Sequence, residues 1–133
     1  MLAAVKTVTP ERIREAFHLG VRRFGENRVQ ERAGKRAALA EFEGEVEWHL
    51  LGPLQSNKAA LALELFSTLE TVDSIALSQR LNRIAERLGL VRVPVLLEVN
   101  LAGEAQKAGV PAAGAVELAA ATRALPRLEL RGL

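Results

Sequence analysis

Lysine is scarce in this sequence, which makes each lysine a candidate for amine chemistry. The 18 basic residues include only four lysines, Lys6, Lys35, Lys58 and Lys107, and the rest are arginines. An amine can release its proton and add to a carbonyl carbon, which a guanidinium does not do. Lys6 stands out because it directly follows the apolar run from Leu2 to Val5, which is typical of a short strand.

The position of Lys6 on that strand indicates where its amine points. Side chains alternate along a strand, so Lys6 shares a face with Leu2 and Ala4. An amine at the mouth of such a strand is expected to be partly removed from water, and desolvation favours the neutral form that attacks an aldehyde. The alternative is a lysine whose stem covers the strand end while its ammonium stays in water.

Other polar residues stand at the ends of further apolar runs. These are Glu26, Asn27, His49, Asp73, Asn100 and Arg131. In a parallel barrel the functional site lies at the carboxyl ends of the strands, so these residues are candidates to lie near Lys6. Structural alternatives exist, because Asp73 and Asn27 could cap helices and His49 could be a core histidine with satisfied hydrogen bonds.

Apolar runs alternate with amphipathic stretches along the whole chain. Strands are predicted over 2–5, 21–24, 46–51, 68–72, 93–101 and 128–133, and helices over 10–19, 28–39, 57–66, from a cap at 73–74 to Gly89, and 112–125. Such alternation is typical of βαβ units and a parallel sheet. Neither glycine fingerprint of a nucleotide-binding open sheet is present, which favours a (β/α)8 barrel of which this chain holds about six strands.

Composition narrows the class of protein. A hydrophobic fraction of 49% and a charged fraction of 26% are ordinary for one globular domain. The absence of cysteine excludes disulfides, thiolate zinc sites and a cysteine nucleophile. The sequence has no apolar run of the roughly 18 to 20 residues that span a bilayer and no signal-peptide pattern, so a cytoplasmic location is expected.

Seven runs of the chain together form a recognisable pattern: Ala4 to Thr7, Phe24 to Glu31, Trp48 to Lys58, Val99-Asn100, Gly103-Glu104, Lys107 to Val110 and Leu130 to Leu133. In these runs the chain resembles the pyridoxal phosphate homeostasis proteins, which are single-domain relatives of the alanine racemase N-terminal barrel. They occur in the family's order over the whole chain.

The resemblance implies that Lys6 carries pyridoxal 5'-phosphate as a Schiff base. It places Asn27, His49 and Asn100 on strand ends that line the cofactor pocket, and Lys107 in a loop beside it. Arg131, in the last matching run, joins the residues expected to bind the cofactor. The family is thought to bind the cofactor and hand it over to apo-enzymes, without an established turnover.

The resemblance also implies departures at both ends of the chain. Members begin with a helix before the first strand and continue through two further βα units, which hold the cofactor phosphate. Residues 1–133 are therefore expected to form a single partial barrel domain with weakened cofactor binding. Members are monomers, whereas exposed strand edges in a partial barrel would favour association.

Two other functions remain open at this point. A racemase or lyase could use the same Schiff base, although the chain contains no tyrosine to serve as the second base of alanine racemase. An RNA-binding module could use the arginine-rich stretch from Arg28 to Arg36. Interleaved charges of both signs and only 4% aromatic residues disfavour RNA, and neither nucleic acid nor a membrane is an expected partner.

Overall fold

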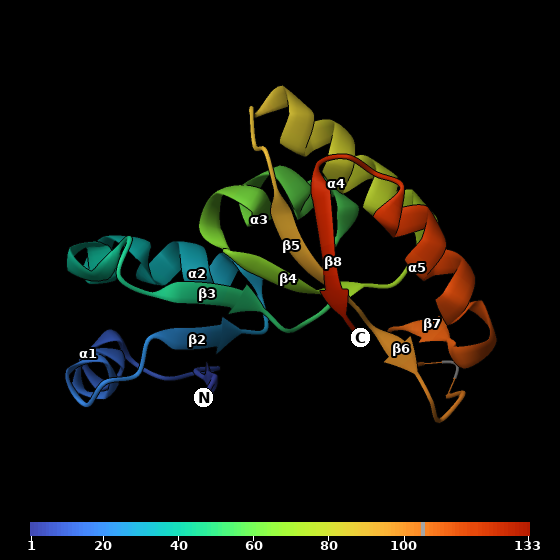
Figure 1. Cartoon of the computed structure of the whole chain (residues 1–133). Helices are drawn as coiled ribbons and strands as arrows, with labels where there is room; N and C mark the ends of the chain where they lie inside the picture. Colours follow the sequence, from blue (N-terminus) through green and yellow to red (C-terminus); the bar gives the residue numbers. More distant parts are fainter. Residues whose placement is uncertain (105) are drawn as a thin grey trace.

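The computed structural model describes residues 1–104 and 106–133, and its centre is a six-stranded parallel sheet (Figure 1). The strand order is β1-β2-β3-β4-β5-β8. Their bounds are Ala3–Ala4 for β1, Arg23–Glu26 for β2, Glu47–Leu50 for β3, Thr68–Val72 for β4, Val93–Leu97 for β5 and Leu128–Gly132 for β8. A separate two-stranded parallel sheet pairs β6 (Val99–Asn100) with β7 (Val110–Pro111).

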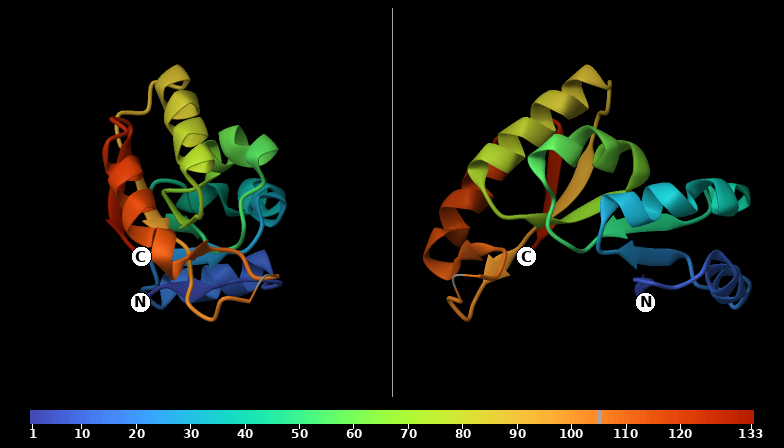
Figure 2. Two further views of the ribbon diagram at one scale, coloured as in Figure 1. Left: turned by 90° about the vertical axis from the view of Figure 1, so that its right-hand side faces the viewer. Right: turned by 180° about the vertical axis from the view of Figure 1, so that it is seen from behind.

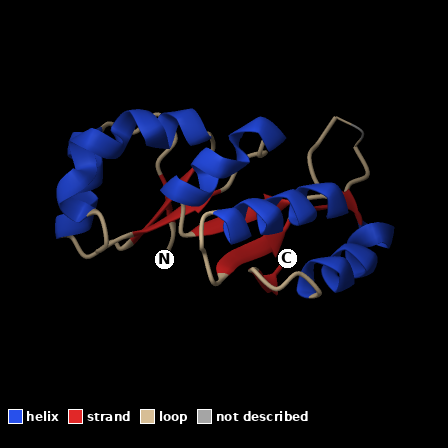
Figure 3. Ribbon diagram, turned by 90° about the horizontal axis from the view of Figure 1, so that it is seen from above, coloured by secondary structure: helices blue, strands red, loops and turns tan. Residues whose placement is uncertain are grey.

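Helices connect successive strands and cover one side of the sheet. The α-helices are α1 (Pro10–His18), α2 (Val29–Arg36), α3 (Ala59–Leu65), α4 (Ile75–Arg87) and α5 (Ala115–Arg123), with 3-10 turns at Ala37–Phe42, Ser56–Lys58 and Ala112–Gly114. The views from behind and from above show the helices on the outer side of the curved sheet (Figures 2 and 3). The carboxyl ends of the strands converge near the middle of the molecule (Figure 1).

The sheet confirms the predicted α/β class with parallel strands. The described strands do not close into a ring, because β1 and β8 each pair on one side only and form the two edges. Closing a barrel of this type takes eight strands, and six parallel strands at normal spacing form only part of the wall. The structure therefore has an outer, helix-covered face and an inner face that is open to solvent.

The core lies between the sheet and the helices because strand side chains alternate between the two faces. Phe24, Trp48, Leu50, Leu69 and Val95 point outward and are buried. Register confirms that these residues share a face, since Phe24 pairs with Trp48 and Leu50 with Leu69. The outer face thus supplies the hydrophobic free energy of folding.

Several predicted bounds shift for identifiable reasons. The predicted strand over 93–101 divides in two, because the N–H of Glu98 still bonds to Val72 while its carbonyl accepts from Val110 in the second sheet. The predicted helix over 28–39 ends at Arg36 and continues as a 3-10 segment. Ser74 caps α4, with its hydroxyl accepting from the N–H of Leu77 at 3.2 Å.

None of the helices in the described part of the chain is long and apolar enough to cross a lipid bilayer.

Candidate functional site

A tight turn carries Lys6 out of β1. The N–H of Val5 donates to Gly25 O at 2.8 Å, which fixes the strand end, and the N–H of Val8 donates back to Val5 O at 3.0 Å, which closes the turn. Thr7 has a φ of 61° inside it. A left-handed conformation costs a residue with a Cβ about 1–2 kcal/mol, and such strain clusters at functional sites. The turn therefore holds Lys6 in a defined place at an energetic cost.

The Lys6 side chain is exposed, so the expectation of a partly desolvated amine is wrong for this structure. Alternation holds as predicted, since Val5 is buried outward while Ala4 and Lys6 are exposed on the inner side. The inner side is solvent-accessible because no strand in the described chain lies opposite it. Lys6 and Asn27 nonetheless share a pocket.

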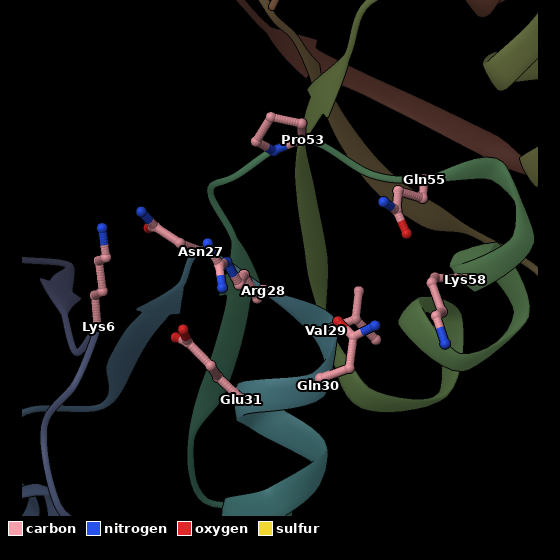
Figure 4. A pocket seen from close by; sticks show the side chains of 9 residues that line it. All are labelled: Lys6, Asn27, Arg28, Val29, Gln30, Glu31, Pro53, Gln55 and Lys58. Atoms are coloured by element: carbon pink, nitrogen blue, oxygen red, sulfur yellow. The ribbon is translucent and has the colours of Figure 1, made fainter.

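This first pocket has a volume of about 710 Å³ and lies between the β1 turn and the loops that follow β2 and β3 (Figure 4). It is lined by Lys6, Asn27, Arg28, Val29, Gln30, Glu31, Pro53, Gln55 and Lys58. The lining contributes three cations and three side-chain amides but only one carboxylate, which favours an anionic ligand with hydrogen-bonding groups. Its volume suits a small-molecule cofactor, since such sites span roughly 300–1,000 Å³.

Close packing of two loops shapes this pocket. A Cβ on Gly52 would lie 2.1 Å from Asn27 O, so only glycine lets the β3 loop pass over the backbone of Asn27. The N–H of Leu51 donates to Glu26 O at 2.8 Å beside this contact. The predicted residue Asn27 is thereby fixed next to Lys6 by backbone contacts, and its helix-cap alternative is not realised, because Arg28 occupies the N-cap position of α2.

A second pocket of about 450 Å³ holds two more of the predicted residues. It is lined by Pro53, Glu98, Val99, Asn100, Leu101, Ala102, Lys107 and Ala108, and it shares Pro53 with the first pocket. The Asn100 amide donates to Glu104 O at 2.8 Å, and its oxygen accepts from the N–H of Gly103 at 3.0 Å, so Asn100 organises the loop. Lys107 forms an ion pair with Glu104 at 2.8 Å.

Glu98 in this second pocket was missed by sequence reasoning, although it also follows a buried apolar run. Burial raises the pKa of Glu98, and the Asp73 carboxylate raises this pKa further. One carboxyl oxygen of Glu98 is buried without a hydrogen-bond partner among the described residues. That oxygen is available to a ligand or to water.

His49 lies within β3 rather than at its end and belongs to a polar row on the inner face. Its Nδ1 is 2.6 Å from Glu70 Oε1, and its Nε2 is 3.7 Å from Glu47 Oε2, which also accepts from Arg23 Nε at 2.8 Å. The Nε2 atom is buried and lacks a hydrogen-bond partner in the described chain. His49 lines neither of the two pockets above.

Arg131, which was also predicted to bind the cofactor, lies apart from both pockets. It lies within edge strand β8, is exposed, and pairs with Glu129 on the same strand at 3.1 Å. It lines neither pocket. The structure thus joins Lys6 with Asn27, and Asn100 with Lys107, in two adjoining pockets, and leaves His49 and Arg131 outside both.

A buried charge cluster lies behind the Lys6 turn. Lys35 Nζ donates to Glu26 Oε1 at 2.6 Å and to Val5 O at 3.1 Å. Burial raises the pKa of Glu26, the bonded Lys35 ammonium opposes this, and the adjacent Glu31 carboxyl raises the pKa further. Sequence reasoning did not single out Lys35 or Glu31 for this position.

Comparisons with known proteins agree with this arrangement. The chain is 44% identical over 137 residues to a pyridoxal phosphate homeostasis protein of Vibrio alginolyticus. It is 42% identical to the structure of PipY of Synechococcus elongatus with pyridoxal phosphate bound, which superposes over 100% of this chain with a TM-score of 0.90. A Clostridium difficile alanine racemase in complex with cycloserine shares the fold at 18% identity, with a TM-score of 0.77 over 98% of this chain.

These relatives are longer than this chain, which spans 58% of the Vibrio protein, 61% of PipY and 35% of the racemase. The sequence profile of one domain family, described as "Alanine racemase, N-terminal domain", matches residues 2–133. This match covers nearly the whole chain, and the parallel sheet with a lysine on the turn after its first strand agrees with it. The chain therefore belongs to the alanine racemase N-terminal domain family.

Proposed function

We propose that this chain binds pyridoxal 5'-phosphate through Lys6 and serves in intracellular pyridoxal phosphate homeostasis. The observation that carries the proposal is the strained Val5–Val8 turn, which presents a lysine amine to a cation-lined pocket of cofactor size. Support comes from the 42% identity to PipY, whose structure was solved with pyridoxal phosphate bound. The curated relatives spanning more than this chain are named for the same homeostasis role.

The residues present fit an aldehyde that carries a phosphate. Bound pyridoxal phosphate would supply an electrophilic aldehyde carbon, and Lys6 is the residue of the pocket whose amine would hold it covalently. Exposure of Lys6 lets its proton pass to bulk water. Arg28 and Lys58 place two further positive charges on the pocket wall, which favours binding of a phosphate dianion.

The other candidate residues have distinct proposed roles. Asn27 orients polar groups of the ligand beside Lys6, and Asn100 with Lys107 borders the adjoining pocket. His49 has an unused ring nitrogen on the inner face, which is suited to a hydrogen bond with a ligand that reaches this face. Arg131 would join the site only through a change of its pairing with Glu129.

Borohydride trapping tests the proposal directly. The chain is mixed with pyridoxal phosphate, reduced, digested and analysed by peptide mass spectrometry. Modification concentrated on Lys6 is expected, and Lys6→Arg should abolish it. Lys58→Arg is the matched control, because it keeps the charge of the pocket and removes only a competing amine. Equal labelling of Lys35, Lys58 and Lys107 would show unspecific amine chemistry and overturn the proposal.

Handing the cofactor to apo-enzymes inside the cell is the finer part of the proposal. An exposed amine in an open pocket lets a recipient lysine reach the bound aldehyde without a large conformational change. The loaded chain should therefore reactivate a pyridoxal phosphate-dependent apo-enzyme faster than its spontaneous release of cofactor allows. Reactivation no faster than release into a trapping scavenger would contradict transfer.

A further inference from the structure

We propose that Lys35, held in place by Glu26, is a positioning residue that fixes the turn bearing Lys6. The inference rests on the proposed function of Lys6 for its chemical meaning. Its structural basis is a cation from α2 that crosses to β1 and bonds to the backbone carbonyl immediately before Lys6.

The contacts of Lys35 join three elements at one point. Its Nζ lies 2.6 Å from Oε1 of Glu26, at the end of β2, and 3.1 Å from Val5 O, at the end of β1. Val5 O also accepts from the N–H of Val8 at 3.0 Å, so one carbonyl both closes the turn and anchors it to α2. The Glu26 side chain is 0% exposed and that of Lys35 only 15% exposed.

Stability alone does not account for burying the Lys35–Glu26 pair. Removing two charges from water costs several kcal/mol, and apolar replacements of buried ion pairs are often neutral or stabilising. A core position facing a sheet would therefore suit an apolar side chain better than Lys35. What an apolar side chain cannot do is donate a hydrogen bond to Val5 O, and this bond is specific to the Lys6 turn.

The surroundings of the pair connect it to the pocket. The Glu31 carboxyl lies beside that of Glu26, and one oxygen of each is buried without another hydrogen-bond partner among the described residues. Glu31 also lines the pocket, where its side chain extends on the same side as Lys6 (Figure 4). The cluster therefore runs from the pocket wall through Glu26 and Lys35 to the backbone of the turn.

Loss of the Lys35 contact should loosen the turn without removing the core. Thr7 would no longer be held in its left-handed conformation by two bonds to Val5 O, and it could relax toward an ordinary backbone conformation. The Lys6 amine would then sample more orientations. A charge-assisted hydrogen bond of this kind corresponds to roughly a tenfold or larger change in the equilibrium it supports.

The test compares Lys35→Met, Lys35→Arg and the control Arg36→Met, which removes an exposed cation from the same turn of α2. The first readout is amide hydrogen exchange of Val8, with Leu50 as a core reference. Lys35→Met should speed exchange of Val8 roughly tenfold relative to Leu50. Lys35→Arg should restore most of the protection because its guanidinium also donates to a carboxylate and a carbonyl. Arg36→Met should change neither.

The second readout is the visible absorbance of the cofactor-loaded chain, titrated with pyridoxal phosphate. Lys35→Met should weaken apparent affinity about tenfold, with recovery in Lys35→Arg. If Val8 exchange relative to Leu50 is unchanged in Lys35→Met, the positioning role is overturned whatever the absorbance does. If exchange responds but borohydride trapping of the unsubstituted chain misses Lys6, the turn is held as inferred and the proposed function fails instead.

Discussion

Replacing Gly52 by alanine tests how tightly the loops beside Lys6 are packed. An added Cβ would lie 2.1 Å from Asn27 O and 2.9 Å from the Asn27 carbonyl carbon. Favourable contacts between such atoms begin near 3.5 Å, so one loop must move by about 1 Å or more. Backbone atoms on both sides of the contact leave no flexible side chain to absorb that movement.

The expected loss of unfolding free energy is about 2 kcal/mol. Overpacking a well-packed site costs about 1–3 kcal/mol. Weakening the nearby hydrogen bond from Leu51 to Glu26 O adds about 1 kcal/mol. Alanine offsets about 0.4–1 kcal/mol of this by restricting the unfolded chain. Urea unfolding followed by fluorescence of Trp48, the single and buried tryptophan, measures the change.

Gly34→Ala is the matched control, because Gly34 lies inside α2 and a Cβ added there would meet no other atom within 4 Å. Alanine there should raise the unfolding free energy by about 0.5–1 kcal/mol through helix propensity. Gly52→Ala should also slow borohydride trapping of Lys6, since Asn27, beside Lys6, lies in one of the two loops that must move apart. A Gly52→Ala chain within about 0.5 kcal/mol of the parent would refute the argument from close packing.

Three further changes test other parts of the structure. Because burial raises the pKa of Glu26, its proton is held more tightly in the folded chain, so stability should fall as pH rises from near 4.5 through the folded pKa. Glu26→Gln should flatten that decline in urea titrations between about pH 4 and 7, and an unaltered slope would contradict the assignment. Thr7→Gly should raise the unfolding free energy by roughly 0.5 kcal/mol, because relief of left-handed strain exceeds the entropic cost of glycine, and a lower urea midpoint would argue against strain. The Arg32 side chain is 1% exposed, and its guanidinium carbon lies 4.2 Å from the Trp48 ring centroid. Arg32→Ala should lower the unfolding free energy by about 2–3 kcal/mol and Arg32→Met by less than half of that, as measured by thermal and urea unfolding.

The sequence predicts the order of elements well because hydrophobic periodicity is a local signal. The strand over 68–72 matches β4 at both ends, and the helix expected to start at Pro10 and stop before Gly20 matches α1 closely. Whether the sheet closes is not local, because closure depends on the number of strands and their register. Residues 93–101 illustrate the same limit, since only pairing with Val110 reveals that this run serves two sheets.

The search for polar residues at strand ends predicted part of the candidate site for a similar reason. It identifies the edge of the sheet where polar residues gather, which brings Lys6 and Asn27 together. It does not give depth along a strand, so His49 lies further inside than expected, in a row of polar side chains with Glu47 and Glu70. A usable signal for Lys35 existed, because it lies three residues after the buried Arg32, as Arg32 lies three after buried Val29.

The outer face of the sheet holds the apolar core, whereas the inner face holds polar side chains of the candidate site. Outward side chains such as Phe24 and Leu50 are buried by helices, and large-to-small changes there should cost several kcal/mol without altering polar groups of the pocket. On the inner face the Lys6 side chain is exposed and His49 pairs with Glu70, so neither belongs to the apolar core. Lys35 breaks this division, since it belongs to the helix-covered side yet bonds to the backbone that presents Lys6. Because the Lys35 ammonium bonds to the carbonyl just before Lys6, removing it should change the position of the Lys6 amine more than the packing of the core.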